Sequence, residues 1–145
     1  MSKEPAGLIY FKISRLIRKS FAEELKSQFG DEISTVEGRA LGFIRHNPGV
    51  SPKEMGEAFG FTKSTVSELV ASLVNKGFVE ALVKEDDRRG KHLFLTKKGE
   101  EIDAKVYAVL EAHDDKLFSD LTEQEWKTVN KIYEKIENRA KGENQ

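Results

Sequence analysis

The chain has 145 residues, of which 34% are charged and 38% hydrophobic, with a formal net charge of -1 at pH 7 and no cysteine. This length supports one domain with its own core, and the composition is typical of a globular, helix-rich protein rather than a disordered one. Without cysteine, disulfide frameworks, thiolate metal sites and thiol redox switches are excluded, which favours a reducing, cytoplasmic location. No apolar run approaches the roughly 18 residues of a membrane span, and the first residues lack a signal-peptide pattern, so we expect no membrane partner.

Positive charge is local rather than general. Residues 8–28 contain five basic and two acidic side chains, residues 84–99 contain six and three, and residues 101–145 contain seven and eleven. A basic patch attracts nucleic acid even when the net charge of the whole chain is near zero. A solvated surface with randomly placed charges would account for the same counts, so the charges alone leave both interpretations open.

The first part of the chain predicts two helices with recognisable ends. Apolar residues recur at steps of three and four across residues 8–29 and stop near Gly30, which predicts a long amphipathic helix. A second helix is expected from Ser34, which forms a capping-box pattern with Glu37, to the Asn-Pro-Gly sequence at 47–49.

Two shorter helices follow, separated by a tight turn. The third is expected from its N-cap Ser51 to its C-terminal stop Gly60, and the fourth is capped by Thr62 and ends before Gly77. The apolar stripe of the fourth helix consists of Val66, Leu69, Val70, Leu73 and Val74. Its opposite face is small or polar and consists of Ser64, Ser67, Glu68, Ala71 and Asn75, with Lys63 and Thr65 at the N-terminal end.

Two short strands and two long helices complete the predicted elements. Residues 78–84 and 91–96 have strand character, and the charged segment 85–90 between them is the expected hairpin tip. One helix runs through the apolar positions of residues 102–117, and a last helix begins with a Thr-Glu capping box at 122–125. We therefore expect a mostly α fold with a small two-stranded β-hairpin.

The third and fourth helices, joined by Phe-Gly-Phe, have the form of a helix-turn-helix. In this motif the second helix lies in the major groove of DNA, and side chains near its N-terminus reach bases and phosphates. Small hydroxyl residues at Ser64, Thr65 and Ser67 suit that role, because bulky side chains would hold the helix out of the groove. An ordinary helical hairpin is the alternative for these two helices alone.

The charged hairpin tip after the fourth helix favours a DNA-binding wing. An arginine on a two-stranded arm can enter the neighbouring minor groove, whose negative potential is strongest where the groove is narrow. Asp86 or Asp87 can hold such an arginine in an extended conformation, and Gly90 supplies the permissive backbone of the turn. The alternative is a solvated hairpin with local ion pairs, each worth at most ~1 kcal/mol.

The run SPKEMGEAFGFTKSTVSELVASLVNKGFVEALVKEDDRRGKHLFLTKKGEE resembles the multiple-antibiotic-resistance regulator (MarR) family of bacterial transcription factors, most clearly in KSTVSELV and DDRRGKHLFLTKKG. The resemblance implies one MarR-like domain over residues 1–145, with a winged helix-turn-helix lobe at 34–96 and long dimerisation helices at 8–29 and 97–139. It also implies a homodimer on a palindromic operator in double-stranded DNA, usually repression, and often relief by a small-molecule effector.

The residues expected to contact DNA come from the third helix, the fourth helix and the wing. They are Lys53, Thr62, Lys63, Ser64, Thr65, Ser67, Glu68, Asp87, Arg88, Arg89 and Lys91. By the resemblance, the hydroxyl residues fall on the DNA-facing helix, while Asp87 and Arg89 fall on the acid and the arginine of the wing. Two residues depart from the family pattern: Glu68 stands where a basic residue is common, and Ala81 stands where an arginine is common. Both departures concern the strength and sequence preference of DNA binding.

In the resembling family, effectors often bind between the terminal helices and the DNA-binding lobe. By that resemblance, an effector pocket would be lined by Tyr10, Phe11, Arg15 and Phe43, although an apolar helix stripe of this kind also serves as core. The missing cysteines exclude the thiol-oxidation mechanism that some relatives use.

We do not expect an enzyme. FTKSTV resembles a phosphate-binding loop only superficially, because Thr62 stands where a glycine must precede the lysine, and no other catalytic motif is present. His46, His92 and His113 are scattered without metal-ligand spacing, so we expect neither a metal nor another cofactor. A winged helix used for protein docking or RNA binding is the alternative function, and salt-dependent, sequence-specific binding to duplex DNA distinguishes the two.

Overall fold

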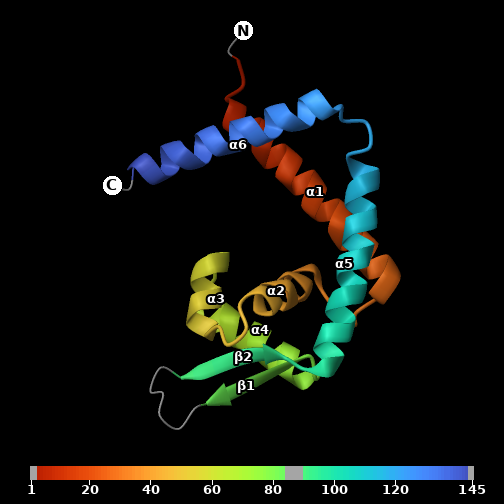
Figure 1. Ribbon diagram of the computed structural model, residues 1–145, viewed down its shortest axis with the longest axis vertical. Coiled ribbons are helices and arrows are strands. Elements are labelled where there is room, and N and C mark those ends of the chain that lie inside the picture. The colour runs from red at the N-terminus through yellow and green to blue at the C-terminus, as the bar shows by residue number, and fades with distance from the viewer. Residues whose placement is uncertain (1–2, 84–89, 144–145) are drawn as a thin grey trace. The chain divides into compact units, whose positions relative to one another are not determined.

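The structure of the protein, a computed structural model, describes residues 3–83 and 90–143 (Figure 1). The helices are α1 (Ala6–Phe29), α2 (Thr35–His46), α3 (Pro52–Phe59), α4 (Lys63–Asn75), α5 (Lys97–Leu117) and α6 (Glu123–Glu143), and the strands are β1 (Val79–Val83) and β2 (Lys91–Leu95). The prediction of a mostly α fold with a small two-stranded hairpin is confirmed. No helix in the described part of the chain has the length and apolar character needed to cross a bilayer.

The chain divides into two compact units, residues 1–111 and residues 112–145. The first unit contains α1 to α4, both strands and most of α5, and the second contains the end of α5 and α6. The described residues that we expect to contact DNA all belong to the first unit. That the whole chain forms one MarR-like domain, with its lobe at 34–96, stays a prediction.

Side-chain caps set the helix limits, as the sequence predicts. At the start of α2, Ser34 Oγ accepts from the Glu37 backbone N–H at 3.1 Å, and Glu37 Oε1 accepts from the Ser34 backbone N–H at 3.0 Å. Thr122 and Glu125 form the same reciprocal pair at the start of α6. At the end of α3, Gly60 adopts a left-handed φ of 69°. Because an N-cap side chain contributes about 1 kcal/mol, these local signals are strong enough to read from the sequence.

The sheet has two antiparallel strands and one additional bridge. β1 and β2 pair from Val79 opposite Leu95 to Val83 opposite Lys91. Val50, in the loop between α2 and α3, forms an isolated antiparallel bridge with Leu93 of β2. This bridge joins the segment that leads into α3 to the hairpin, so both are held together by backbone hydrogen bonds.

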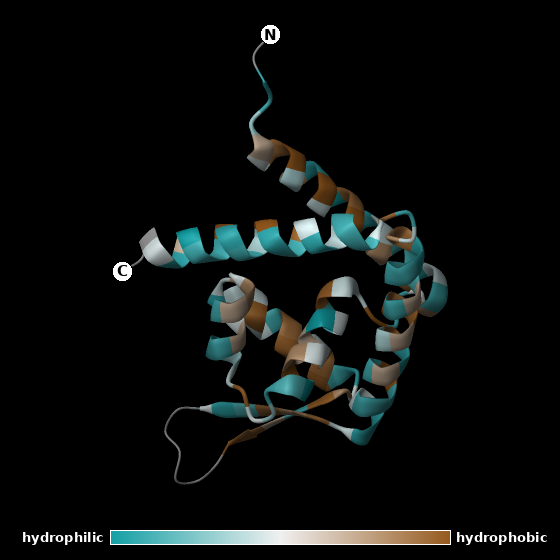
Figure 2. Cartoon of the chain, turned by 45° about the horizontal axis from the view of Figure 1, so that its top comes forward, coloured by the Kyte–Doolittle hydropathy of each residue, from teal (hydrophilic) through white to brown (hydrophobic). Residues whose placement is uncertain are grey.

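The core of the first unit takes side chains from all of its elements. Its largest fully buried side chains are those of Leu25, Ile33, Leu41, Ile44, Met55, Leu73, Phe78 and Leu93. Ile102 and Val106 bring α5 into the same cluster. Apolar residues appear in brown along the helices and strands of this unit in Figure 2. One side of α4 is therefore occupied by the core, and its opposite side is left for other contacts.

α5 begins in close backbone contact with the residues before β1. The Thr96 backbone N–H donates to the Phe78 carbonyl at 3.0 Å, and Thr96 Oγ1 donates to the Gly77 carbonyl at 2.6 Å. A Cβ atom at Gly99 would lie 1.9 Å from the Phe78 carbonyl oxygen, so only glycine fits at this position. This contact fixes where α5 leaves the hairpin.

Candidate nucleic-acid interface

α4 buries one face and exposes the other, as the helical pattern predicts. Its buried side chains are Val66, Leu69, Val70 and Leu73. The predicted contact residues of this helix are all exposed: Lys63, Ser64, Thr65, Ser67 and Glu68. Val74 differs from the prediction, because it is 41% exposed rather than packed in the stripe. It follows Val70 by four residues and so lies about 40° beyond it, past the edge of the buried face.

α3 lies close against α4 because of a glycine at the contact. A Cβ atom at Gly56 would lie 2.8 Å from Val66 Cγ2, which is too close for any side chain. After the turn at Gly60, the Phe61 backbone N–H donates to the Gly56 carbonyl at 2.9 Å. The two helices therefore form the tight helix-turn-helix that the sequence predicts.

Thr62 caps α4 and leaves the start of the helix open to a ligand. Its Oγ1 accepts from the Thr65 backbone N–H at 3.2 Å and donates to Thr65 Oγ1 at 3.0 Å. Both side chains are exposed. Helix N-termini favour anions, because free backbone N–H groups and the helix dipole point toward them. A DNA phosphate is one anion of this kind.

Three predicted lysines from different elements converge on one groove. Lys53 comes from α3, Lys63 from α4 and Lys91 from β2, and all three line a groove of about 810 Å³ together with the α4 residue Ser67. No residue in the described ranges forms an ion pair with these lysines. Glu57 also lines the groove, so its charged residues are three lysines and one carboxylate. The net positive charge is available to an outside partner beside the exposed face of α4.

The predicted contacts at the tip of the hairpin, Asp87, Arg88 and Arg89, lie outside the described residues. The strands on either side are described: Val83 and Lys91 form the last pair of the register. Gly90 has a φ of 94°, which agrees with the prediction that a permissive backbone is needed there. The roles of the tip residues stay predictions.

The residues expected to line an effector pocket occupy two helices. On α1, Tyr10 is 45% exposed, Phe11 is 72% exposed, and Arg15 is also exposed. On α2, Phe43 is half-buried against the core, and its ring meets that of Phe59 edge to face at 5.3 Å between centroids. Phe43 therefore has a packing role, and the effector role of the four residues stays a prediction.

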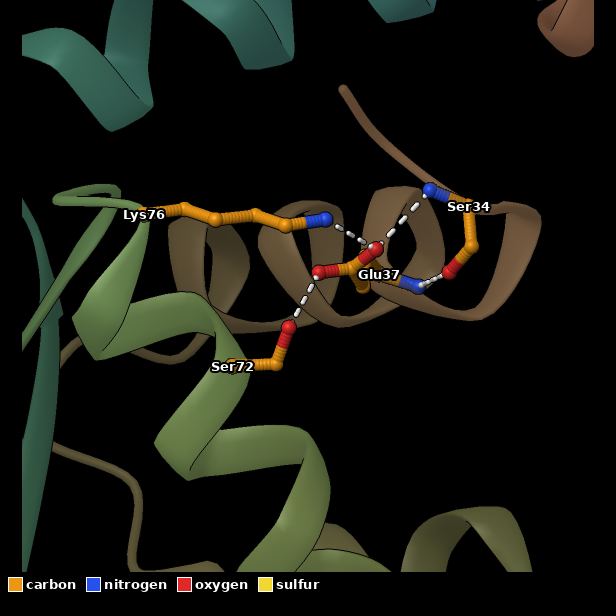
Figure 3. Close-up of polar contacts among 4 residues, drawn as sticks. All are labelled: Ser34, Glu37, Ser72 and Lys76. Carbon is orange, nitrogen blue, oxygen red and sulfur yellow. Dashed lines mark hydrogen bonds and ion pairs between the residues drawn. The ribbon is translucent and has the colours of Figure 1, made fainter. Parts of the chain in front are cut away.

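A polar network between α2 and α4 is the feature that sequence reasoning missed (Figure 3). Besides its capping bond to Ser34, Glu37 Oε1 accepts from Lys76 Nζ at 2.9 Å, and Glu37 Oε2 accepts from Ser72 Oγ at 2.9 Å. Glu37 is only 7% exposed. The sequence shows the capping role of Glu37, but its partners on and after α4 stand 35 and 39 residues away.

The network also sets the charge state of Glu37. Burial by itself raises the pKa of this carboxyl, but the hydrogen bonds from Lys76, Ser34 and Ser72 together outweigh burial and hold the pKa below its ordinary value of 4.5. Glu37 is therefore a carboxylate at neutral pH, paired with the Lys76 ammonium.

Comparison with known proteins agrees with this arrangement. The model of the MarR family matches residues 32–90. The HTH-type transcriptional regulator BilQ of Clostridium symbiosum is 32% identical over 127 residues, which cover 83% of this chain and 85% of BilQ. This regulator family is not a family of enzymes, which confirms that no catalytic activity is to be expected.

Solved structures show the same fold. A mutant of Escherichia coli MarR complexed with operator DNA has a TM-score of 0.79 and 22% identity, covering 91% of this chain and 93% of that one. Streptococcus pneumoniae FabT in complex with DNA has a TM-score of 0.78 and 24% identity, covering 94% and 95%. Together, the winged helix-turn-helix and the match to BilQ and the family model show that this chain belongs to the MarR family of transcriptional regulators.

Proposed function

We propose that this protein is a sequence-specific regulator of transcription that acts in the cytoplasm as a homodimer on double-stranded DNA. In this proposal α4 lies in the major groove, and the lysines of the groove meet phosphates on either side of it. The observation that carries the proposal is the convergence of Lys53, Lys63 and Lys91 beside the exposed polar face of α4. The DNA complexes of the structurally similar MarR and FabT support it by analogy.

Exposed apolar residues on the terminal helices support a homodimer. In the first unit, α1 exposes Leu8, Ile9, Tyr10, Phe11, Ile13 and Leu16. In the second unit, α6 exposes Trp126, Val129, Tyr133 and Ile136. Apolar surface of this extent is unusual on a monomer, and a second copy of the chain is the partner that closed symmetry supplies most simply. Two copies related by a twofold axis read a palindromic operator.

We further propose repression as the mode of regulation and a small molecule as the signal that relieves it. A dimer seated on an operator blocks other proteins from the same DNA. Tyr10, Phe11, Arg15 and Phe43 are the proposed effector contacts, because aromatic rings and a guanidinium suit an aromatic anion. Fluorescence titration of Phe11→Ala and Arg15→Ala with aromatic carboxylates tests this part, and unchanged affinity in both variants counts against it.

The DNA-binding proposal is tested by selecting binding sites from genomic DNA with the purified protein. We expect a single palindromic motif, bound with an affinity that falls steeply as salt is raised, because bound lysines displace counterions from phosphates. Recovery of no motif, or preference for RNA over duplex DNA, contradicts the proposal and favours the docking or RNA-binding alternative.

The contribution of the three lysines can be measured with the DNA site that this selection yields. Lys53→Gln, Lys63→Gln and Lys91→Gln should each weaken binding and lower the slope of log affinity against log salt by roughly one per half-site. Lys105→Gln is the matched control, because Lys105 is exposed on α5 and outside the groove. If the control changes the slope as much as the three groove variants do, the groove is not the phosphate-binding surface.

A further inference from the structure

The hydrogen bonds of Glu37 reach α4 at the flank between its exposed and buried faces. Ser72 follows Glu68 by four residues, so it lies about 40° around the helix from the exposed face. Lys76, which caps the end of α4, lies about 40° further around the helix, next to the buried stripe. The hydrogen bonds from Ser72 and Lys76 to Glu37, which we call the link, therefore join α2 to the edge of α4 rather than to its exposed face.

The position of the link matters because apolar packing limits the rotation of a helix less sharply than directional bonds do. Contacts of Val66, Leu69, Val70 and Leu73 with the core are non-directional, so a small roll of α4 about its axis can keep much of the apolar burial. Hydrogen bonds from a buried carboxylate are directional and charge-assisted, so a roll would stretch them. Glu37 can also hold its own position firmly, because its capping bonds tie it to the start of α2.

We infer that Glu37 is a positioning residue for DNA recognition, which acts through Ser72 and Lys76 to hold α4 at the rotation that presents its polar face to the bases. This inference rests on the proposed function, because rotation of α4 matters for recognition only if α4 reads DNA. Side chains that contact bases must be held within about 10–20° of their productive orientation. A roll of α4 larger than this is therefore enough to weaken its contacts with bases. Contacts to phosphates through flexible lysines tolerate the same roll better.

The inference therefore predicts a loss of discrimination rather than a general loss of binding. Ser72→Ala removes one hydrogen bond of the link, and Glu37→Gln keeps the shape while removing the charge. The matched control is Ile44→Val, a mild core substitution at a fully buried residue of α2 that leaves the link intact. All three variants are compared well below their unfolding temperatures, so that the folded fraction is the same.

The first measurement is the ratio of affinity for the selected operator to affinity for unrelated duplex DNA at one salt concentration. We expect Ser72→Ala and Glu37→Gln to lower this ratio roughly fivefold or more, the discrimination that one weakened base contact carries. Ile44→Val should leave the ratio unchanged. A general loss of fold stability would lower the ratio in all three variants, whereas a shift of α4 would lower it only in Ser72→Ala and Glu37→Gln.

The second measurement reports the position of α4 without DNA. The chain has no cysteine, so His46→Cys on α2 and Ser67→Cys on α4, both at exposed positions, accept spin labels at two unique sites. Labelled chain diluted into excess unlabelled chain gives one label pair per dimer, and pulsed electron resonance gives the distance distribution between the labels. We expect the distribution to shift or broaden in the link variants and to stay unchanged in Ile44→Val.

The outcomes separate the inference from the proposed function. If the parent protein does not discriminate between operator and unrelated DNA, the proposed function is wrong. The inference about Glu37 is then wrong as well, because it rests on that function. If the parent discriminates, and either the affinity ratio or the label distance is unchanged in both link variants, the inference alone is overturned.

Discussion

Glu68 is the one acidic residue among the predicted DNA contacts on α4. A different role for Glu68 would be a simple surface ion pair with a nearby lysine. Glu68 is exposed on α4, and none of the ion pairs between described residues includes it, which argues against that role. A phosphate would repel its carboxylate, whereas the amino group of cytosine in the major groove is a donor that a carboxylate accepts. We therefore interpret Glu68 as a selector of base sequence rather than an anchor.

Replacing Glu68 with glutamine tests this role. The substitution keeps the shape and removes the repulsion, so we expect higher affinity for unrelated DNA and a loss of roughly 1 to 3 kcal/mol of discrimination at one base pair per half-site. Competition binding against all single-base substitutions of the operator measures both effects. Glu101→Gln, an exposed α5 carboxyl, is the control. If Glu68→Gln keeps the parent's preference at every position, Glu68 reads no base.

Because of the Glu37 network, we expect the free energy of unfolding to depend on pH in the acid range. Hydrogen bonds from Lys76, Ser34 and Ser72 outweigh burial and lower the pKa of Glu37 in the folded state, so the unfolded chain binds a proton more readily. The stabilisation is fully present above the unfolded pKa and is lost as pH falls through the lower, folded pKa. We expect Glu37→Gln to flatten the fall in unfolding free energy on the acid side of the ordinary value of 4.5. Urea unfolding over a pH series measures this, and a slope identical to the parent's contradicts it.

At the scale of elements, the contact between the start of α5 and Phe78 is the least tolerant of change. A methyl group at residue 99 would meet the Phe78 carbonyl at 1.9 Å, and backbone cannot move aside as a flexible side chain can. We expect Gly99→Ala to destabilise the fold by about 3 kcal/mol, at the upper end of overpacking costs.

Urea unfolding at fixed protein concentration measures the effect of Gly99→Ala, with Gly7→Ala as its control. Gly7 lies in α1, and a Cβ there meets nothing within 4 Å. The control should therefore raise stability by up to about 1 kcal/mol through helix propensity. Equal stability of the two alanine variants would show that α5 can shift to accommodate a side chain at 99.

For the whole molecule, the exposed apolar residues of α1 and α6 predict a stable dimer. Sedimentation equilibrium at micromolar concentration should give twice the chain mass of 16.4 kDa. Tyr133→Glu on α6, at a residue that is 62% exposed, should shift the protein toward monomer, because it would bury a charge in the interface. Val83→Glu is the matched control, since Val83 is 65% exposed on β1. A parent that sediments as a monomer defeats the dimer proposal.

Much of this protein was readable from the sequence because the relevant interactions are local. The capping pairs Ser34 with Glu37 and Thr122 with Glu125 join residues three apart, so they mark helix limits whatever the rest of the chain does. The spacing of apolar residues likewise predicted which face of α4 is exposed. The pattern of a helix-turn-helix followed by a wing then indicated the MarR family, and comparison with relatives shows that the chain belongs to it.

What only the tertiary structure decided concerns residues that are distant in the chain. The bridge between Val50 and Leu93 depends on how elements pack, and no local pattern encodes it. The same is true of the three lysines of the groove, which come from three separate elements. Glu37 takes part in both kinds of interaction, the local and the long-range. Its capping bond was visible in the sequence, but its bonds to Ser72 and Lys76 exist only because folding brings α2 against α4 and leaves a buried carboxylate that must be paired.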